Sequence, residues 1–423
     1  MKRHGFLRST AVLMSGTVVA QALAFAFSLL LARLYDDVSF GHYAVFTSTL
    51  AILGVLSTGA YDKALIFSAS ERRYRAVVLV VLVVSAGVAA AVVVFGLLAQ
   101  LAIGLWGDTA TAVGQVLLLA TATLCYAWSQ LYVYSSLRRE APRDVAVAKV
   151  GQSALTGAAQ SGFGMLSLVH GLSIGHAVGL LVFPVALRRS LRAAGVRFTR
   201  LTQVAARSTA RKLSVYPRFV CLNEVLDAVS NQAPLLLIGA LFSLGTLGQY
   251  GFAMRMLAAP AALVGQAVSQ TFLQQIGVGR LSAPETRRLM FRVWGALFLV
   301  GILPFGIVFL FGDVIFSTVF GATWVEAGQI AAISAPLLLA RFMSSPTSSI
   351  VYKLEMQRMQ FVFSVAGTVI RTVPVFTALA GATLRQVIIM QTVGEILMIL
   401  AFNATALRRL QRGSRGARVP GNA

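Results

Sequence analysis

Four polar residues lie along one side of a single apolar segment, at residues 217–241. Asn223, Glu224, Asp227 and Asn231 recur at helical intervals of three and four residues. An ionisable side chain inside a membrane helix costs roughly 2.5–3.5 kcal/mol on insertion scales, and it usually faces a cavity or a partner. We therefore treat Glu224 and Asp227, together with Glu395 in a later apolar segment, as candidate sites for proton or Na⁺ coupling.

Basic residues within the apolar segments outnumber these three acids. A guanidinium group matches phosphate oxygens with a planar fork and does not lose its charge, so this surplus favours an anionic substrate. The predicted substrate-binding residues, which line a cationic cavity, are Arg255, Arg341, Arg371, Arg218, Lys149 and Arg33. The neutral polar residues predicted to line the same cavity are Gln21, Asn223, Asn231 and Gln266.

The same charges have a second interpretation, in which they only hold helices in register. Under it Glu224 or Asp227 pairs with Arg255, and Glu395 pairs with Arg371. A further acid, Asp62, lies at the predicted cytoplasmic end of the second segment. We expect Asp62 to be structural and to pair with Lys63 or Arg218.

The composition shows which elements must position these residues. The chain has 423 residues, of which 57% are hydrophobic and 12% charged, and its mean hydropathy is +0.79. A typical globular domain has about twice that charged fraction, so the chain is predicted to be an all-α polytopic membrane protein. Its two cysteines, Cys125 and Cys221, lie in apolar stretches and are expected to be reduced.

Twelve apolar segments are long enough to be predicted as spans. They are residues 10–31, 41–60, 76–100, 112–134, 145–164, 168–187, 217–241, 248–271, 291–311, 328–350, 359–380 and 386–407. Most of the 36 Lys and Arg residues fall in alternate loops, which the positive-inside rule assigns to the cytoplasm together with both termini. The first segment also resembles a signal peptide ending at residues 22–24, but its apolar run continues to Leu31, so we expect it to be retained.

The spans divide into two halves that resemble each other. Leu34-Tyr35 aligns with Leu241-Phe242, and Gly41 with Gly248. We predict an N-terminal six-helix bundle at residues 1–187, a basic cytoplasmic linker at 188–216 that touches anionic lipid headgroups, a C-terminal six-helix bundle at 217–407 and a basic tail at 408–423. An even number of spans makes the two bundles parallel, around a central cavity typical of a transporter.

Several functional classes are excluded by what the sequence lacks. It has no P-loop, no HExxH or CxxC motif, and no metal spacing among its four histidines. We therefore expect no cofactor and no metal. Scattered basic clusters, in place of one basic domain, argue against nucleic-acid binding despite a net charge of +22.

Short motifs in both halves resemble the Wzx-type polysaccharide flippases, which belong to the multidrug/oligosaccharidyl-lipid/polysaccharide (MOP) exporter superfamily. Members read Ala-Arg-Leu-x-x-Pro-x-x-Phe-Gly-x-Tyr where this chain has Ala32-Arg33-Leu34 and Phe40-Gly41-His42-Tyr43, with Asp-Asp-Val at 36–38 as a departure in the loop. The other matching stretches are residues 59–65, 231–237, 247–253, 265–270 and 320–328. Together they cover about a third of the chain, and their order is more specific than any one motif.

The resemblance implies a MATE-like fold with a V-shaped cavity that opens alternately to each side. It implies a cargo of undecaprenyl-pyrophosphate-linked oligosaccharide, moved from the cytoplasmic to the periplasmic leaflet of the bacterial inner membrane for O-antigen, capsule or exopolysaccharide synthesis. It also implies a polysaccharide polymerase and a chain-length regulator as partners. Two alternatives stay open: a multidrug or cation antiporter of the same superfamily, and a polysaccharide polymerase.

Overall fold

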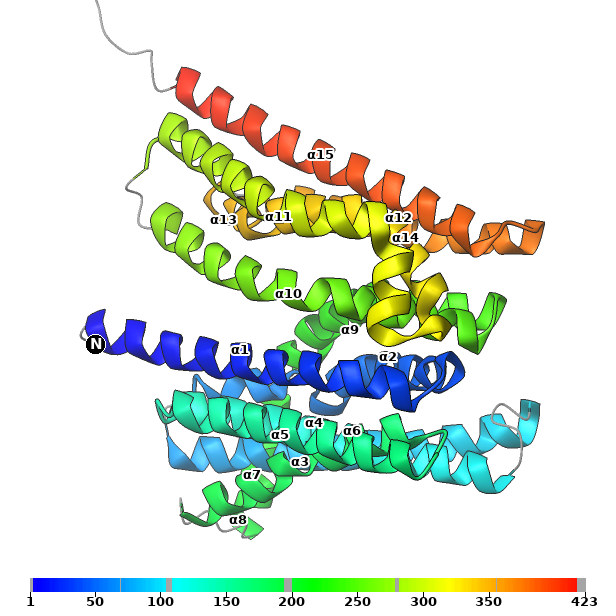
Figure 1. Cartoon of the computed structure of the whole chain (residues 1–423). Coiled ribbons are helices and arrows are strands. Elements are labelled where there is room, and N and C mark those ends of the chain that lie inside the picture. Colours follow the sequence, from blue (N-terminus) through cyan, green and yellow to red (C-terminus); the bar gives the residue numbers. More distant parts are fainter. Residues whose placement is uncertain are drawn as a thin grey trace, which may run out of the picture. The chain divides into compact units, whose positions relative to one another are not determined.

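The computed structural model consists of helices joined by short loops (Figure 1). It describes residues 3–68, 70–103, 109–193, 200–277, 281–354 and 356–416, and no strand occurs within these ranges. By internal contacts the chain divides into two compact units, residues 1–236 (unit 1) and 237–423 (unit 2). The predicted bundle and linker boundaries, by contrast, were set from charge and hydropathy, and they stay predictions.

Within these described ranges, fifteen α-helices follow one another along the chain. They are α1 (Arg3–Leu34), α2 (Asp37–Thr58), α3 (Glu71–Ile103), α4 (Thr109–Arg138), α5 (Pro142–Met165), α6 (Gly171–Leu180), α7 (Val182–Ala193), α8 (Arg200–Lys212), α9 (Cys221–Leu241), α10 (Leu244–Gly277), α11 (Ala283–Phe320), α12 (Val325–Ser344), α13 (Ile350–Lys353), α14 (Gln357–Phe376) and α15 (Leu384–Gly416). Short 3-10 or π turns lie between them: η1 (Tyr61–Leu65), η2 (Tyr216–Val220), η3 (Ala322–Trp324), η4 (Ser345–Thr347) and η5 (Thr377–Ala380).

Helices α1 and α5 pack closely in unit 1 because small residues let them approach. A Cβ atom added at Gly157 of α5 would lie 2.1 Å from the ring of Phe27 in α1. One added at Gly16 of α1 would lie 2.3 Å from the side chain of Ala146. Small residues are common at helix contacts in membrane proteins. Lipid tails are as apolar as the helix surfaces, so helices associate through close packing and not through the hydrophobic effect.

Unit 2 has a comparable close contact between α11 and α12. A Cβ atom added at Gly328 would meet the backbone oxygen of Gly312 at 2.4 Å. Beside this contact Phe252 of α10 stacks against Trp324, with ring centroids 4.1 Å apart. Helix α11 bends at Phe311, which has non-helical dihedral angles (φ −130°, ψ 22°), and the bend is visible in yellow in Figure 1.

All twelve predicted spans coincide with helical segments. Among the described residues, nine stretches are long and apolar enough to cross a membrane, which makes this a multi-pass membrane protein. The predicted spans at 145–164, 217–241 and 248–271 form helices α5, α9 and α10 but are not among these nine. The count of twelve therefore stays a prediction.

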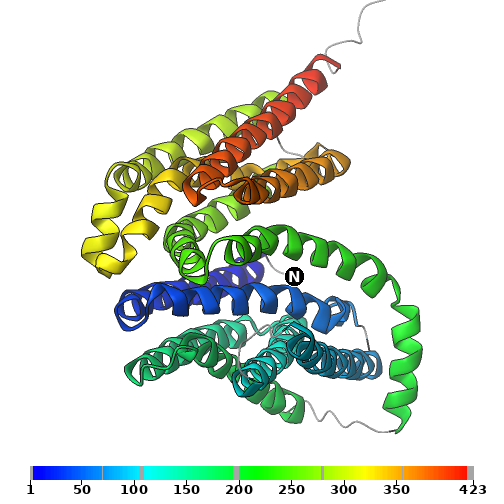
Figure 2. The same ribbon diagram turned by 90° about the vertical axis from the view of Figure 1, so that its right-hand side faces the viewer.

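Two of the predicted spans are interrupted. The segment 168–187 is divided at Leu181 between α6 and α7, and the segment 328–350 is divided by η4 at Ser345–Thr347. Pro346 in η4 has no backbone N–H to continue the helix. Figure 2 shows the ribbon of the chain turned by 90° about the vertical axis.

Candidate functional site

An ion pair joins α12 to α15 inside unit 2. Nη2 of Arg341 contacts Oε2 of Glu395. The Glu395 side chain is only 6% exposed, whereas the Arg341 side chain is 42% exposed. Arg341 therefore neutralises a buried carboxylate while its own side chain stays partly exposed.

Helices α10 and α14 bring two more polar residues to this pair. Tyr250 of α10 lies within electrostatic range of Arg341, Glu395 and Arg371. The Nε of Arg371 donates a hydrogen bond to the carbonyl oxygen of Gly367 at 3.0 Å, within α14. We call Tyr250, Arg341, Arg371, Gln391 and Glu395 the arginine cluster; it contains two guanidinium groups and one carboxylate.

Gln391 connects α15 to α14 at this site. Its Nε2 donates to the main-chain carbonyl of Arg371 at 2.6 Å. Gln391 lies one helical turn before Glu395 and is buried like it. Nearby, the hydroxyl of Ser334, two turns before Arg341 on α12, is buried without a hydrogen-bond partner. The cluster is thus a polar patch held within apolar helices.

Tyr250 and Gln391 are site residues that the charge pattern of the sequence does not indicate. Both are neutral, and the search for charged residues in apolar segments passes over them. The interval of four residues between Gln391 and Glu395 is a signal that could have indicated Gln391. No comparable signal exists for Tyr250, because its place depends on how α10 packs in unit 2.

Two acids of the alternative interpretation form ion pairs with cations other than those expected, while the pairing of Asp227 with Arg255 stays a prediction. Glu395 pairs with Arg341, where Arg371 was expected. Glu224 pairs with Lys63, where Arg255 was expected. The reason is packing: α12 lies against α15, and the first turn of α9 lies beside η1.

Asp62 is a second buried carboxyl group, in η1 of unit 1. The residue is 3% exposed, and its Oδ1 has no hydrogen-bond partner. Lys63 forms its ion pair with Glu224, so the expected ion pair of Asp62 with Lys63 or Arg218 is not formed. Burial raises the pKa of Asp62, against smaller opposing effects of Thr58 and Lys63.

The other predicted residues are distributed over both units. In unit 1 the exposed predicted residues are Arg33, Arg218, Asn223 and Asp227, and Lys149 is half-buried. The side-chain amide of Asn231 donates a hydrogen bond to the main-chain carbonyl oxygen of Asp227 at 2.8 Å. Gln21 is half-buried, and its Oε1 is buried without a hydrogen-bond partner. In unit 2, Arg255 is half-buried in α10. It follows Tyr250 by five residues and so points about 140° away from it around the helix. The side chain of Gln266 lies outside the described residues.

No metal site accompanies these residues. Within the described ranges, no group of three or more His, Cys, Asp or Glu side chains could hold a metal ion. The arginine cluster provides the N–H donors of two guanidinium forks, next to the single buried carboxylate of Glu395. Such a fork suits phosphate or carboxylate oxygens.

Comparison with solved structures shows the class of fold. A structure described as "Lipid II flippase MurJ, inward closed conformation" has a TM-score of 0.71 at 13% identity, covering 97% of this chain and 94% of that one. An inward-facing multidrug resistance MATE family transporter of the MOP superfamily has a TM-score of 0.60 at 13% identity, covering 93% and 96%. A MATE protein in complex with MaD3S also has a TM-score of 0.60 at 13% identity, covering 97% and 96%. The chain thus has the fold of MOP-superfamily transporters.

The family follows from the sequence itself. Residues 30–329 match the family described as "Polysaccharide biosynthesis protein", and this range is more than half of the chain. The chain belongs to that family. A search of curated protein sequences finds no match.

Proposed function

We propose that the protein is a flippase of the bacterial inner membrane, with both termini in the cytoplasm. It moves undecaprenyl-pyrophosphate-linked oligosaccharide from the cytoplasmic to the periplasmic leaflet by alternating access. Membership of the polysaccharide biosynthesis family supports the pathway. The fold is shared with a lipid II flippase and with MATE transporters, which supports the proposal that the protein is a transporter and not an enzyme.

The observation that carries the proposal is the partly exposed Arg341 side chain beside the buried carboxylate of Glu395. A pyrophosphate headgroup needs cationic donors to replace water inside the membrane. Arg341 and Arg371 supply two such groups around one carboxylate, so the formal charge of the cluster is positive. Arg341 binds cargo oxygens while it stays in contact with Glu395.

Glu395 is the strongest of the three candidate coupling sites. It is buried and depends on Arg341 for charge compensation, whereas Asp227 is exposed and Glu224 pairs with the half-exposed Lys63. When cargo phosphate also binds Arg341, it shares the charge of the arginine, so Glu395 loses part of its compensation and takes up a proton or Na⁺. Release of the cargo reverses this change at Glu395, which ties ion binding to transport.

The first experiment analyses undecaprenyl-linked lipids extracted from cells that lack the protein. The proposal predicts that a complete oligosaccharide unit accumulates on the cytoplasmic side while surface polysaccharide is lost. Complete units that accumulate already exposed to the periplasm would instead indicate a polymerase. Unchanged lipid intermediates would favour an antiporter of the same superfamily, for which ion-dependent drug efflux is the direct assay.

The second experiment separates cargo binding from helix pairing. Arg341→Gln removes both roles, and the double variant Arg341→Gln/Glu395→Gln removes the charged pair without leaving an unpaired carboxylate. If Arg341 binds cargo, both variants lose surface polysaccharide while the double variant still accumulates in the membrane. Restored transport in the double variant would show that the pair is only structural. Arg385→Gln, an exposed arginine at the start of the same helix α15, is the matched control.

Two protein partners belong to this proposal: a polysaccharide polymerase and a chain-length regulator. A flipped unit must be polymerised in the periplasm, so both proteins would act directly after the flippase. Cross-linking in intact cells, followed by identification of the captured chains, is the test of this association.

A further inference from the structure

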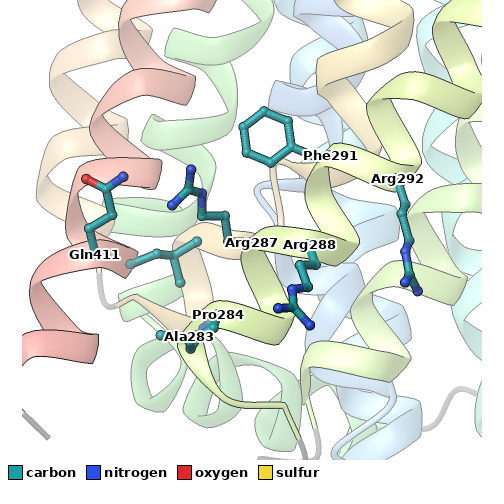
Figure 3. Close-up of a pocket in the computed structure, with 8 residues that line it drawn as sticks. Ala283, Pro284, Arg287, Arg288, Phe291, Arg292 and Gln411 are labelled. Carbon is teal, nitrogen blue, oxygen red and sulfur yellow. The ribbon is translucent and has the colours of Figure 1, made fainter. Parts of the chain in front are cut away.

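A basic pocket lies between α11 and α15 in unit 2 (Figure 3). Its volume is about 520 Å³, and its lining combines cationic and apolar side chains. The residues that line it are Ala283, Pro284, Arg287, Arg288, Phe291, Arg292, Leu410 and Gln411. None of them belongs to the arginine cluster or to the predicted substrate-binding residues.

Three arginines on the first turns of α11 define the charge of this pocket. Arg287 extends towards Gln411 of α15, and Arg288 and Arg292 point back towards the start of α11 (Figure 3). All three side chains are exposed, and within the described part of the chain none forms an ion pair with a carboxylate. Glu285 lies within electrostatic range of Arg288, but its Oε2 accepts hydrogen bonds from the N–H and the hydroxyl of Ser282, both at 2.7 Å.

The apolar part of the pocket leads into the membrane-facing side of α11. Phe291 is half exposed, and the guanidinium carbon of Arg287 lies 5.7 Å from the centre of its ring. Further along α11, Phe298 and Ile302 lie seven and eleven residues after Phe291 and so share its face of the helix, and both are exposed apolar residues, as expected for a surface in contact with lipid chains. The pocket therefore lies where the polar start of α11 gives way to its apolar stretch.

Charge and position together indicate the class of ligand. The positive-inside rule assigns this end of α11 to the cytoplasmic side, where anionic lipids are attracted to basic segments. Arginine forks bind phosphate oxygens with two donors, and a basic pocket between helices is a typical headgroup site. The adjoining apolar wall suits an acyl chain, which inorganic phosphate does not have.

We propose that this pocket binds an anionic glycerophospholipid from the cytoplasmic leaflet. The phosphate group lies between Arg287, Arg288 and Arg292, and one acyl chain runs past Phe291 along α11. The bound lipid fills the space between α11 and α15 and holds the two helix ends together. It is a structural lipid site, separate from the cargo route.

Native mass spectrometry of the purified full-length protein tests the proposal, with phosphatidylglycerol, phosphatidylcholine, undecaprenyl phosphate and inorganic phosphate as separate probes. The triple variant Arg287→Gln/Arg288→Gln/Arg292→Gln should weaken phosphatidylglycerol binding at least about tenfold. The matched control is Arg188→Gln/Arg189→Gln/Arg192→Gln, which removes the same charge from three exposed arginines of α7 that do not line this pocket. Phosphatidylglycerol binding by this control variant should change less than about twofold.

A charge-neutral variant keeps the test decisive if the triple variant does not fold. Ala283→Trp fills the pocket without removing an arginine, and it should weaken phosphatidylglycerol binding by a similar factor. Equal losses in the pocket and control triples would overturn the proposal, as would equal binding of phosphatidylcholine. Preferential binding of undecaprenyl phosphate would overturn it too, because the pocket would then belong to cargo handling. Tight binding of inorganic phosphate alone would exclude a role for the acyl chain.

Discussion

Glu395 of α15 is buried against Arg341 of α12, yet only the carboxylate is hidden: 6% of its side chain is exposed, against 42% of the arginine. The pair is asymmetric as a result. The buried carboxylate of Glu395 depends on Arg341 for charge compensation, whereas the Arg341 side chain is partly exposed. Removing either partner should therefore have different consequences for stability.

The first prediction concerns this asymmetry. Arg341→Gln leaves a buried carboxylate without its cation and should cost about 2–3 kcal/mol, less than for a fully buried pair because Arg341 is partly exposed. Glu395→Gln leaves a partly exposed arginine and should cost about 1 kcal/mol. Thermal unfolding in detergent measures both, and the double variant should recover most of the loss. A larger cost for Glu395→Gln than for Arg341→Gln would contradict this view of the pair.

The second prediction follows from the raised pKa of Asp62. Because the folded state binds the proton more tightly than the unfolded chain, stability falls as pH rises from the usual carboxyl pKa, about 3.9, towards the raised value. Asp62→Asn removes this effect. It should leave stability unchanged near pH 3.5 and increase it by the order of 1 kcal/mol at pH 7.5.

Melting temperatures measured across this pH range provide the check on Asp62. Asp144→Asn, a variant of an exposed acid at the start of α5, serves as the control and should show no such pH-dependent gain. A loss of stability in Asp62→Asn at pH 7.5 would mean that the folded protein requires the charged carboxylate.

The third prediction concerns the contact between α1 and α5. Gly157→Ala places a methyl group against the ring of Phe27 and should destabilise unit 1 by about 1–3 kcal/mol. Gly162→Ala in the same helix meets nothing within 4 Å, so it should be neutral or stabilise by about 0.5–1 kcal/mol. If Phe27→Ala restores the stability of Gly157→Ala, the clash is the cause; equal effects of the two glycine variants would refute it.

The fourth prediction tests the spans that fall outside the nine candidates. If α5 and α9 both cross the membrane, Leu166→Cys after α5 and Ser243→Cys after α9 should react with an impermeant maleimide added outside. Lys212→Cys before α9 should react only after the cells are permeabilised. Cys125 and Cys221 are buried, so the unmodified chain provides the background. Labelling of Ser243→Cys only from inside would remove α9 from the set of spans.

The helices could be predicted from the sequence because long apolar runs require internal hydrogen bonding in a membrane. Every predicted span is a helical segment, and the family resemblance pointed to the fold that the solved structures share. The break at Leu181 is marked by Pro184, which has no N–H to donate to the carbonyl of Leu180, but the prediction of one span from hydropathy did not use this signal. The break at Ser345–Thr347 is likewise marked by Pro346 within a run of small polar residues at 344–349, which the apolar residues on both sides outweigh in a hydropathy window.

The site was harder to predict than the helices. Charge in apolar segments identified Arg341, Arg371 and Glu395, which the structure brings together in unit 2. The sequence indicated Arg371 as the partner of Glu395, whereas the structure pairs this acid with Arg341, because helix rotation and packing decide between two arginines on different helices. The same limit applies to Glu224, whose partner Lys63 lies in a turn that the search for spans passed over.

The bend of α11 at Phe311 has a consequence for the bilayer itself. Residues 283–311 rise about 43 Å at 1.5 Å per residue, close to the full thickness of a membrane with its headgroups. The nine residues beyond the bend need not continue along the membrane normal, and exposed Val314 and Val319 suit them to the outer interface. A straight 38-residue helix would overshoot the bilayer and suffer hydrophobic mismatch. With the bend, the length of α11 that has to match the bilayer ends at Phe311, and the close contact of Gly312 with Gly328 fixes this point against α12.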